Sequence, residues 1–225
     1  SIRYLIPTSW GVSTYTRHLV WRVGALRVYL KHGVHLSPTA VKRGTTGYDV
    51  CLTVTPGETA ALRASSGYED QLVEVGMPRY DALVPTPPSR TVLFMPTWRK
   101  YLVSKVLDGS TEGERPYEGS SYQRFMSGFL ESPRLQEMLE RYDYRLTFLP
   151  HYNMAPKFEG ARVAGERVSV ADADSVAIQD MIRECDAFIT DYSSVHFDVA
   201  YMGTPLVYVR FDQDEYDTLH ASPSW

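Results

Sequence analysis

Short apolar runs rich in β-branched residues recur along the chain, and helical patterns separate several of them. Runs of this length, bounded by Gly, Pro or polar turn residues, predict buried strands. The predicted strands are residues 27–30, 49–54, 71–75, 91–95, 145–149, 187–190 and 206–211. A helix is predicted after Thr55, where Thr-Pro-Gly-Glu is a typical helix start, and residues 122–142 predict one or two more.

The last third of the chain has the clearest order of elements. Four apolar residues at i, i+3, i+4 and i+7 predict one face of a helix: Ile178, Met181, Ile182 and Cys185. A short strand at residues 187–190, a polar turn, and a helix running to about Met202 follow. Gly203 closes that helix before the strand at 206–211. Short connections of this kind predict an α/β fold with a doubly wound parallel sheet.

A Pro-rich stretch at residues 85–88 is the best candidate for a linker between domains. It predicts a first domain over residues 1–85 and a second over residues 86–225. Residues 104–121 are rich in Gly, Ser and Glu and predict a surface loop.

Composition and charge exclude several classes of protein. The chain has 225 residues, of which 44% are hydrophobic and 22% charged, so it can bury a core. Its net charge of −4 gives no electrostatic reason to expect nucleic-acid binding. Cys51 and Cys185 lie in apolar runs without a CxxC pattern, which predicts small buried residues and a reducing, cytoplasmic compartment. There is no run of 18 apolar residues that would predict a membrane span.

Motifs for common cofactors and metals are missing from the sequence. It contains no GxGxxG, GxxxxGK[ST], GxSxG or HExxH pattern, and no metal or cofactor is predicted. The acidic run Asp212–Asp217 lacks the spacing of a calcium loop, so a solvated loop is the expectation there.

The turn Asp191-Tyr192-Ser193-Ser194 is a candidate anion site. It follows a strand and opens a helix, where free backbone N–H groups and the helix dipole attract negative charge. The carboxyl edge of a doubly wound sheet is also where ligands bind. The alternative is ordinary helix capping by Asp191 or Ser193, which is common at such positions.

Two histidines follow predicted strands directly. His32 stands in a Gly-marked turn, and His151 lies within Pro150-His151-Tyr152. An imidazole can accept a proton from an attacking hydroxyl or donate a hydrogen bond to a phosphate oxygen. The alternative for each is a loop histidine bonded to the backbone. Two arginines, Arg79 and Arg99, also follow strand ends, and they predict either phosphate contacts or structural salt bridges.

Taken in order, six segments resemble one family. They are KHGV (31–34), TVTPGE (53–58), GMPRYD (76–81), MPTWR (95–99), LPHY (149–152) and TDYSSVHFDVAYMGTPLVYVRFDQDEY (190–216). This series is similar to the CDP-glycerol glycerophosphotransferases, the polymerases and primases of teichoic-acid synthesis. The last segment is the most specific, and the resemblance covers roughly residues 28–216.

The resemblance implies a GT-B-like architecture and a set of roles. Residues 1–85 would be the end of an acceptor-side Rossmann-like domain, most of which is absent, and residues 86–225 a shortened nucleotide-donor domain. A polyol hydroxyl would attack the β-phosphorus of a CDP-polyol and release CMP, with His32 as base and His151 as partner of the donor phosphates. The other donor-binding residues would be Thr190, Asp191, Ser193, Ser194, Arg79 and Arg99.

The resemblance also implies partners and a location. The acceptor would be a polyol-phosphate polymer or a lipid-linked primer, and the enzyme would work at the inner face of a bacterial membrane. Family members commonly have Trp-His-Gly-Thr-Pro where this chain has Lys31-His32-Gly33-Val34-His35, and an arginine where it has Leu149. Two alternatives remain open: a GT-B glycosyltransferase that uses a nucleotide sugar, and a non-catalytic nucleotide-binding remnant.

Overall fold

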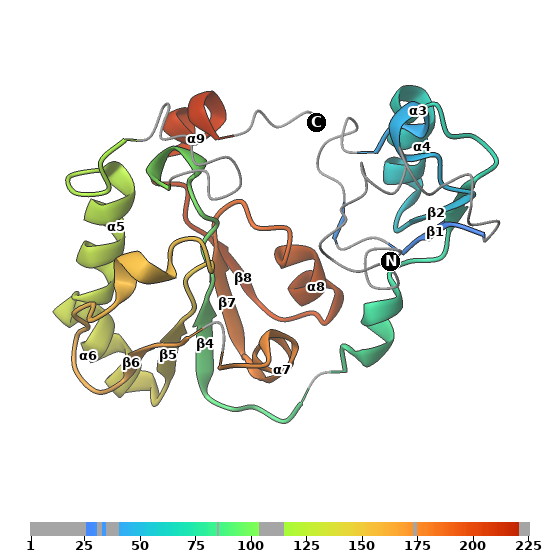
Figure 1. The fold of residues 1–225 in the computed structure, drawn as a ribbon. Helices are drawn as coiled ribbons and strands as arrows, with labels where there is room; N and C mark the ends of the chain where they lie inside the picture. Colours follow the sequence, from blue (N-terminus) through green and yellow to red (C-terminus); the bar gives the residue numbers. More distant parts are fainter. Residues whose placement is uncertain are drawn as a thin grey trace. The chain divides into compact units, whose positions relative to one another are not determined.

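The structure is a computed structural model that describes residues 26–30, 33–34, 41–84, 86–103, 115–172 and 175–220 (Figure 1). The contacts between its residues divide it into two compact units, the first ending at Ala82 and the second beginning at Leu83. Each unit has its own parallel sheet and its own hydrophobic core.

The first unit contains a parallel three-stranded sheet in the order β1-β2-β3. Its elements are β1 (Val28–Tyr29), α3 (Arg43–Thr46), β2 (Val50–Thr53), α4 (Pro56–Ser66), β3 (Leu72–Glu74) and the 3-10 helix η3 (Pro78–Ala82). Cys51, Leu62, Tyr68 and Leu72 form its core with Val41. Cys51 is therefore the small buried residue that the sequence predicts, and so is Cys185 in the second unit.

Helix α4 begins where the sequence predicts a helix start. The Thr55 hydroxyl accepts a hydrogen bond from the Glu58 N–H at 3.2 Å, and Pro56 occupies the first turn, where a missing N–H costs nothing. The Glu58 carboxylate accepts from the Val54 N–H at 2.8 Å, which satisfies a further backbone donor. Gly67, with φ of 75°, ends the helix in the left-handed conformation that glycine adopts at low cost.

The second unit contains a parallel five-stranded sheet in the order β6-β5-β4-β7-β8. The strands are β4 (Thr91–Phe94), β5 (Arg145–Phe148), β6 (Val168–Val170), β7 (Ala187–Thr190) and β8 (Leu206–Tyr208). Every pairing is parallel, as the short strand-helix-strand connections predict. Strand β6 at the sheet edge is not among the predicted strands.

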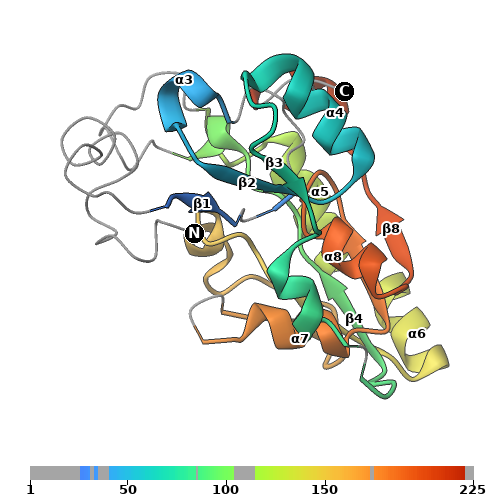
Figure 2. The ribbon, with the colours of Figure 1, turned by 90° about the vertical axis from the view of Figure 1, so that its right-hand side faces the viewer.

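Helices cover both faces of this sheet (Figures 1 and 2). Helices α5 (Ser121–Leu130) and α6 (Pro133–Tyr142) lie on one face, and α7 (Ile178–Glu184) and α8 (His196–Tyr201) lie on the other. The core under α5 and α6 includes Phe94, Phe148, Met126 and Leu139. The described part of the second unit also contains two short 3-10 helices, η4 (Lys100–Leu102) and η5 (Ala155–Phe158).

The acidic run near the C-terminus is a helix, so the expected solvated loop is wrong. Helix α9 (Gln213–Leu219) lies at the end of the sheet where the strands finish, and its N-cap Asp212 is only 5% exposed. A carboxylate can be buried in this way only when a cation and hydrogen bonds compensate its lost hydration. No helix in the described part of the chain is both long and apolar enough to cross a membrane.

Candidate active site

The carboxyl ends of β4 and β7 lie side by side at the middle of the five-stranded sheet. The Met95 N–H donates to the Ile189 carbonyl at 3.0 Å, so the two strands remain paired up to their ends. The chain leaves β4 toward α5 on one face and leaves β7 toward α8 on the other. Such a reversal of direction is the position at which open α/β sheets bind ligands. The segments that follow β4, β5, β7 and β8 form the candidate site.

A buried ion triad of Arg99, Asp191 and Asp212 joins three of these segments. Arg99 Nε donates to Asp212 Oδ2 at 2.7 Å, and Arg99 Nη2 donates to Asp212 Oδ1 at 2.8 Å and to Asp191 Oδ2 at 2.9 Å. All three side chains are 0–5% exposed as residues, and Arg99 is fully enclosed. The Tyr101 hydroxyl adds a longer hydrogen bond to Asp212 at 3.3 Å.

Arg99 has no N–H group left for a ligand. Its two remaining donors, both on Nη1, go to the carbonyl oxygens of Thr97 at 2.7 Å and Trp98 at 3.4 Å. Four aromatic rings surround the guanidinium, with its central carbon 5.0–5.4 Å from their centroids: Tyr122, Tyr192, Phe211 and Tyr216. Although burial alone lowers the pKa of Arg99, its hydrogen bond to Asp212 and the charges of both carboxylates outweigh that and raise it. Arg99, which was expected to line the cleft, therefore forms a structural salt bridge, the alternative that the sequence analysis gave for it.

Thr190 and Asp191 are also used inside the fold. The Thr190 hydroxyl donates to the Met95 carbonyl at 2.8 Å, and the residue is 0% exposed. Asp191 Oδ1 accepts from the Thr97 N–H at 2.7 Å and the Tyr192 N–H at 2.6 Å, while Oδ2 pairs with Arg99. Both side chains hold the segments after β4 and β7 together, and their expected contact with a donor phosphate stays a prediction.

Ser193 and Ser194 keep polar groups that the fold does not use. Among the described residues, none accepts a hydrogen bond from the Ser193 or Ser194 backbone N–H, and none bonds the Ser194 hydroxyl. Ser193 Oγ accepts a long hydrogen bond from the Val195 N–H at 3.4 Å. Both serines are half-buried. Helix α8 begins only at His196, a little later than the sequence predicts, so both serines lie in the turn before it. Adjacent N–H groups in a turn form a concave site suited to an anion.

His151 lies at the same edge, directly after β5. Its Nδ1 accepts a hydrogen bond from the Asn153 N–H at 3.2 Å, which leaves the proton of the neutral ring on Nε2. Burial lowers the pKa of His151 below its usual value, so the ring is neutral at pH 7. No described residue bonds Nε2, and this N–H is available as a donor.

Two residues next to His151 belong to the site although the sequence did not single them out as candidates. Trp98 stacks on His151 with ring centroids 5.8 Å apart, and His220 meets Trp98 edge-on at 5.3 Å. Trp98 stands within the MPTWR segment that carries the resemblance, which was a usable signal. His220 follows the acidic run by three residues. It could have been placed one helical turn after Tyr216 only if the acidic run had been predicted to form a helix.

Arg210 is a third residue that the sequence reasoning missed. It follows β8, is exposed, and its guanidinium lies 5.9 Å from the Tyr192 ring and 6.0 Å from the Tyr208 ring. Unlike Arg99, it has no carboxylate partner among the described residues. It is thus a cation next to the turn that carries Ser193 and Ser194.

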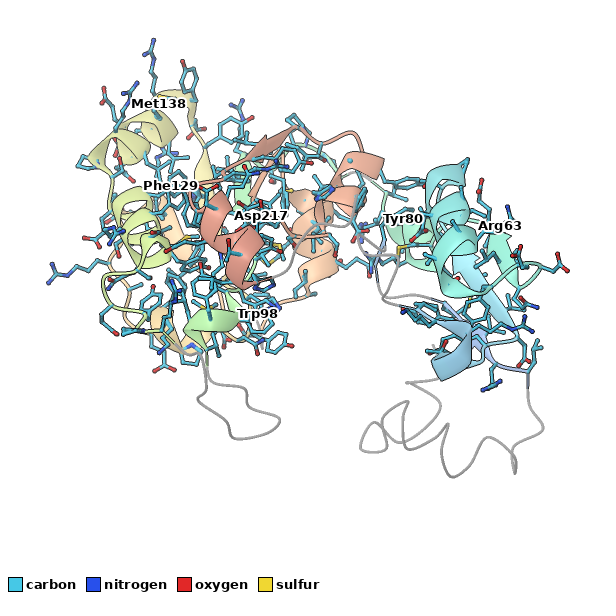
Figure 3. All side chains as sticks on the ribbon, turned by 90° about the horizontal axis from the view of Figure 1, so that it is seen from above. Arg63, Tyr80, Trp98, Phe129, Met138 and Asp217 are labelled. Carbon is cyan, nitrogen blue, oxygen red and sulfur yellow. The ribbon has the colours of Figure 1, made fainter. Side chains whose placement is uncertain are left out.

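The remaining predicted residues cannot be added to this group. His32 lies outside the described residues, and Arg79 lies half-buried on η3 in the first unit. Within the described ranges, no cluster of three or more His, Cys, Asp or Glu side chains is placed to hold a metal ion. An apolar groove between α5 and α6, walled by Phe129 and Met138, contains none of the predicted site residues (Figure 3).

Sequence comparison assigns the chain to a family. The profile of the CDP-Glycerol:Poly(glycerophosphate) glycerophosphotransferase family matches residues 29–220, which is most of the sequence. The chain belongs to this family. The resemblance read from the six segments is thereby confirmed.

Individual relatives agree with this glycerophosphotransferase assignment. The chain is 28% identical over 197 residues to the minor teichoic acid biosynthesis protein GgaB of Bacillus subtilis (strain 168), covering 83% of this chain and 21% of GgaB. Structures of the wall teichoic acid polymerase TagF, one of them soaked with CDPG, match with a TM-score of 0.53 at 19–20% identity. They cover 79% of this chain and 42–43% of TagF. This likeness confirms the expected α/β, GT-B-like fold class.

Loss of the central cation should destabilise the second unit. Arg99→Met leaves two buried carboxylates without a counter-charge, and we expect the free energy of unfolding to fall by about 3–5 kcal/mol. Chemical denaturation monitored by near-UV circular dichroism measures the change. Arg141→Met, at an exposed position on α6, is the matched control and should stay within about 0.5 kcal/mol. A loss below about 1 kcal/mol in the Arg99 variant would contradict the central role of the triad.

Stability should fall as the pH is lowered from about 6.5 toward 4. Burial lowers the pKa of His220 to about 4, whereas an unfolded histidine titrates near 6.5. Between these values the unfolded chain binds more protons, so acid favours unfolding. Melting temperatures measured across this range should depend less on pH in His220→Asn, which keeps an acceptor near the Nδ1 position. An unchanged slope in that variant would show that His220 does not titrate as described.

Proposed function

We propose that this chain binds a CDP-polyol, most simply CDP-glycerol, and contributes to transferring its polyol phosphate to the hydroxyl end of a teichoic-acid or capsule-type polymer, with release of CMP. Family membership supports the reaction class, and the TagF structure soaked with CDPG supports the donor. The chain spans only 21% of GgaB and 43% of TagF, so the complete reaction is proposed for the protein to which this chain belongs.

The observation that carries the proposal is the pair of unused N–H groups at Ser193 and Ser194, beside the point where the direction of the sheet connections reverses. Together with the Ser194 hydroxyl they offer three donors in one turn. A diphosphate needs several hydrogen-bond donors around its oxygens, and backbone donors in a fixed turn supply them without reorganisation. A nucleotide sugar also carries a diphosphate, so the donor must be tested directly.

His151 and Arg210 would complete the donor site. Neutral His151 presents Nε2–H as a hydrogen-bond donor to a phosphate oxygen, and Arg210 supplies the positive charge that Arg99 does not. Both residues follow strands of the same sheet, β5 and β8, so they approach the turn from either side of β4 and β7.

The chemical step requires a nucleophile and a base. The acceptor hydroxyl oxygen forms a bond to the β-phosphorus, the bond between that phosphorus and the bridging oxygen breaks, and CMP departs with both bonding electrons. The proton of the hydroxyl goes to a base, for which His32 is the residue implied by the family resemblance. A polymer or lipid-linked acceptor would bring this reaction to the inner face of a bacterial membrane.

Donor binding is measured first by thermal shift with CDP-glycerol, CDP-ribitol, CMP and a UDP-sugar. A ligand that binds only the folded chain raises its melting temperature by mass action. We expect CDP compounds to raise it and the UDP-sugar to leave it unchanged. A shift with the UDP-sugar alone would assign the chain to the glycosyltransferases, and no shift with any nucleotide would contradict a donor site in these residues.

The serine turn is tested with a single hydroxyl deletion. Ser194→Ala removes one charge-assisted hydrogen bond to the diphosphate and should weaken CDP-glycerol binding by about 1.5–3 kcal/mol, measured by titration calorimetry. Ser127→Ala, at an exposed position on α5, is the control that should bind like the original chain. Equal dissociation constants in the two variants would remove Ser194 from the site.

A further inference from the structure

Six aromatic rings form a continuous row along the carboxyl edge of the second unit. In order they are Tyr192, Tyr216, His220, Trp98, His151 and Tyr152, with successive centroids 3.7, 4.7, 5.3, 5.8 and 4.2 Å apart. Aromatic pairs at these separations attract one another beyond the area that they bury. Figure 3 labels Trp98 on the segment after β4, on the same side of the unit as α9, which carries Asp217.

One end of this row is fixed by the buried ion triad. The Tyr216 and Tyr192 rings are stacked at an interplanar angle of 12°, and the Arg99 guanidinium carbon lies 5.0 Å from the Tyr216 centroid. His220 stacks on Tyr216 at 14°, and its Nδ1 accepts a hydrogen bond from the Lys100 N–H at 3.1 Å. The imidazole of His220 therefore has a fixed plane and a fixed tautomer.

His151, the histidine proposed to contact the donor, lies toward the other end of the row, between Trp98 and Tyr152. The hydrogen bond from the Asn153 N–H to Nδ1 allows the His151 ring to pivot about it, and the exposed Tyr152 ring contacts His151 at a tilt of 33°. Trp98 lies almost parallel to the His151 ring, at 21°, and blocks this motion on one face. The tilt of the Trp98 ring is in turn set by its edge-on contact with His220, at an interplanar angle of 83°.

We propose that Trp98 is a positioning residue that fixes the imidazole plane of His151, and that His220 holds Trp98 in place. The inference rests on the proposed function, because it assumes that His151 Nε2–H is directed at a phosphate oxygen. A misdirected donor loses most of a hydrogen bond, since the interaction weakens steeply away from linearity. In this proposal Trp98 affects donor affinity through His151 and not by a contact of its own.

The test combines donor binding with a direct view of His151. Calorimetry measures the dissociation constant of CDP-glycerol for the 225-residue chain and for Trp98→Leu, Trp98→Phe, His151→Ala and the Trp98→Leu/His151→Ala double variant. NMR of histidine-labelled protein reports the ring nitrogens of His151 in the first two variants. Tyr142→Leu, at an exposed ring on α6, is the control for loss of an aromatic side chain.

We expect Trp98→Leu to weaken binding roughly three- to tenfold, the range typical of one aromatic pair, and Trp98→Phe to recover most of it. In the His151→Ala background, Trp98→Leu should cause no further loss, because it acts through that histidine. The His151 nitrogen shifts should move in Trp98→Leu, because a ring that can pivot makes a weaker hydrogen bond with the Asn153 N–H. Independent, multiplying losses in the double variant would overturn the positioning role and indicate a general packing effect.

The two hypotheses fail in different ways. If His151→Ala binds CDP-glycerol like the original chain while Trp98→Leu still shifts the His151 nitrogen signals, the proposed donor role is wrong and the positioning contact stands. If His151→Ala weakens binding but Trp98→Leu changes neither the affinity nor the signals, the inference is wrong and the donor role stands.

His220→Ala provides a second variant that leaves the Trp98 side chain in place. It removes the ring that meets the Trp98 edge, and we expect a smaller loss of affinity with the same direction of change in the His151 signals. His151 signals identical to those of the original chain would exclude His220 from the row's function.

Discussion

The ion pairs of Arg99 with Asp191 and Asp212 hold together the segments that follow β4, β7 and β8. Burying three charged groups costs several kcal/mol each, and the cost is offset only when every hydrogen bond is made in good geometry. That requirement fixes the backbone at Thr97 and Tyr192, whose N–H groups bond Asp191. The orientation of the neighbouring serine turn and of the aromatic row follows from these fixed positions.

A consequence for the proposed donor site is that it would offer an anion mainly neutral hydrogen-bond donors. Arg99 makes all of its hydrogen bonds inside the fold. His151 is uncharged at neutral pH, and the serine turn offers N–H and O–H groups. Arg210 is exposed, so solvent screens its attraction for an anion. Preorganised donors in a fixed frame contribute more selectivity for shape than a cluster of mobile cations does.

The strand and helix pattern of the second unit could be predicted because it depends on local order. The run from Ile178 to Tyr208 follows the predicted sequence of helix, strand, turn, helix and strand. The role of Arg99 could not be predicted, because its partner Asp212 is 113 residues away and no local spacing marks the pair. The acidic segment was misjudged for the same reason, since a run of charges is usually solvated unless a distant cation buries one of them.

The central pairing of β4 with β7 also constrains how the chain acquires its structure. The Thr190 hydroxyl donates to the carbonyl of Met95, 95 residues earlier, where β7 pairs with β4, the middle strand of the sheet. Contacts between residues so far apart in sequence form slowly during folding, because closing the long intervening loop costs chain entropy. During synthesis on the ribosome, the segment carrying Arg99 therefore emerges long before Asp191 and Asp212. Until those residues and β7 are made, the guanidinium has no carboxylate partner and one edge of β4 is unpaired. Chains interrupted before Asp212 would lack the second carboxylate of the triad and also Tyr216 and His220 of the aromatic row.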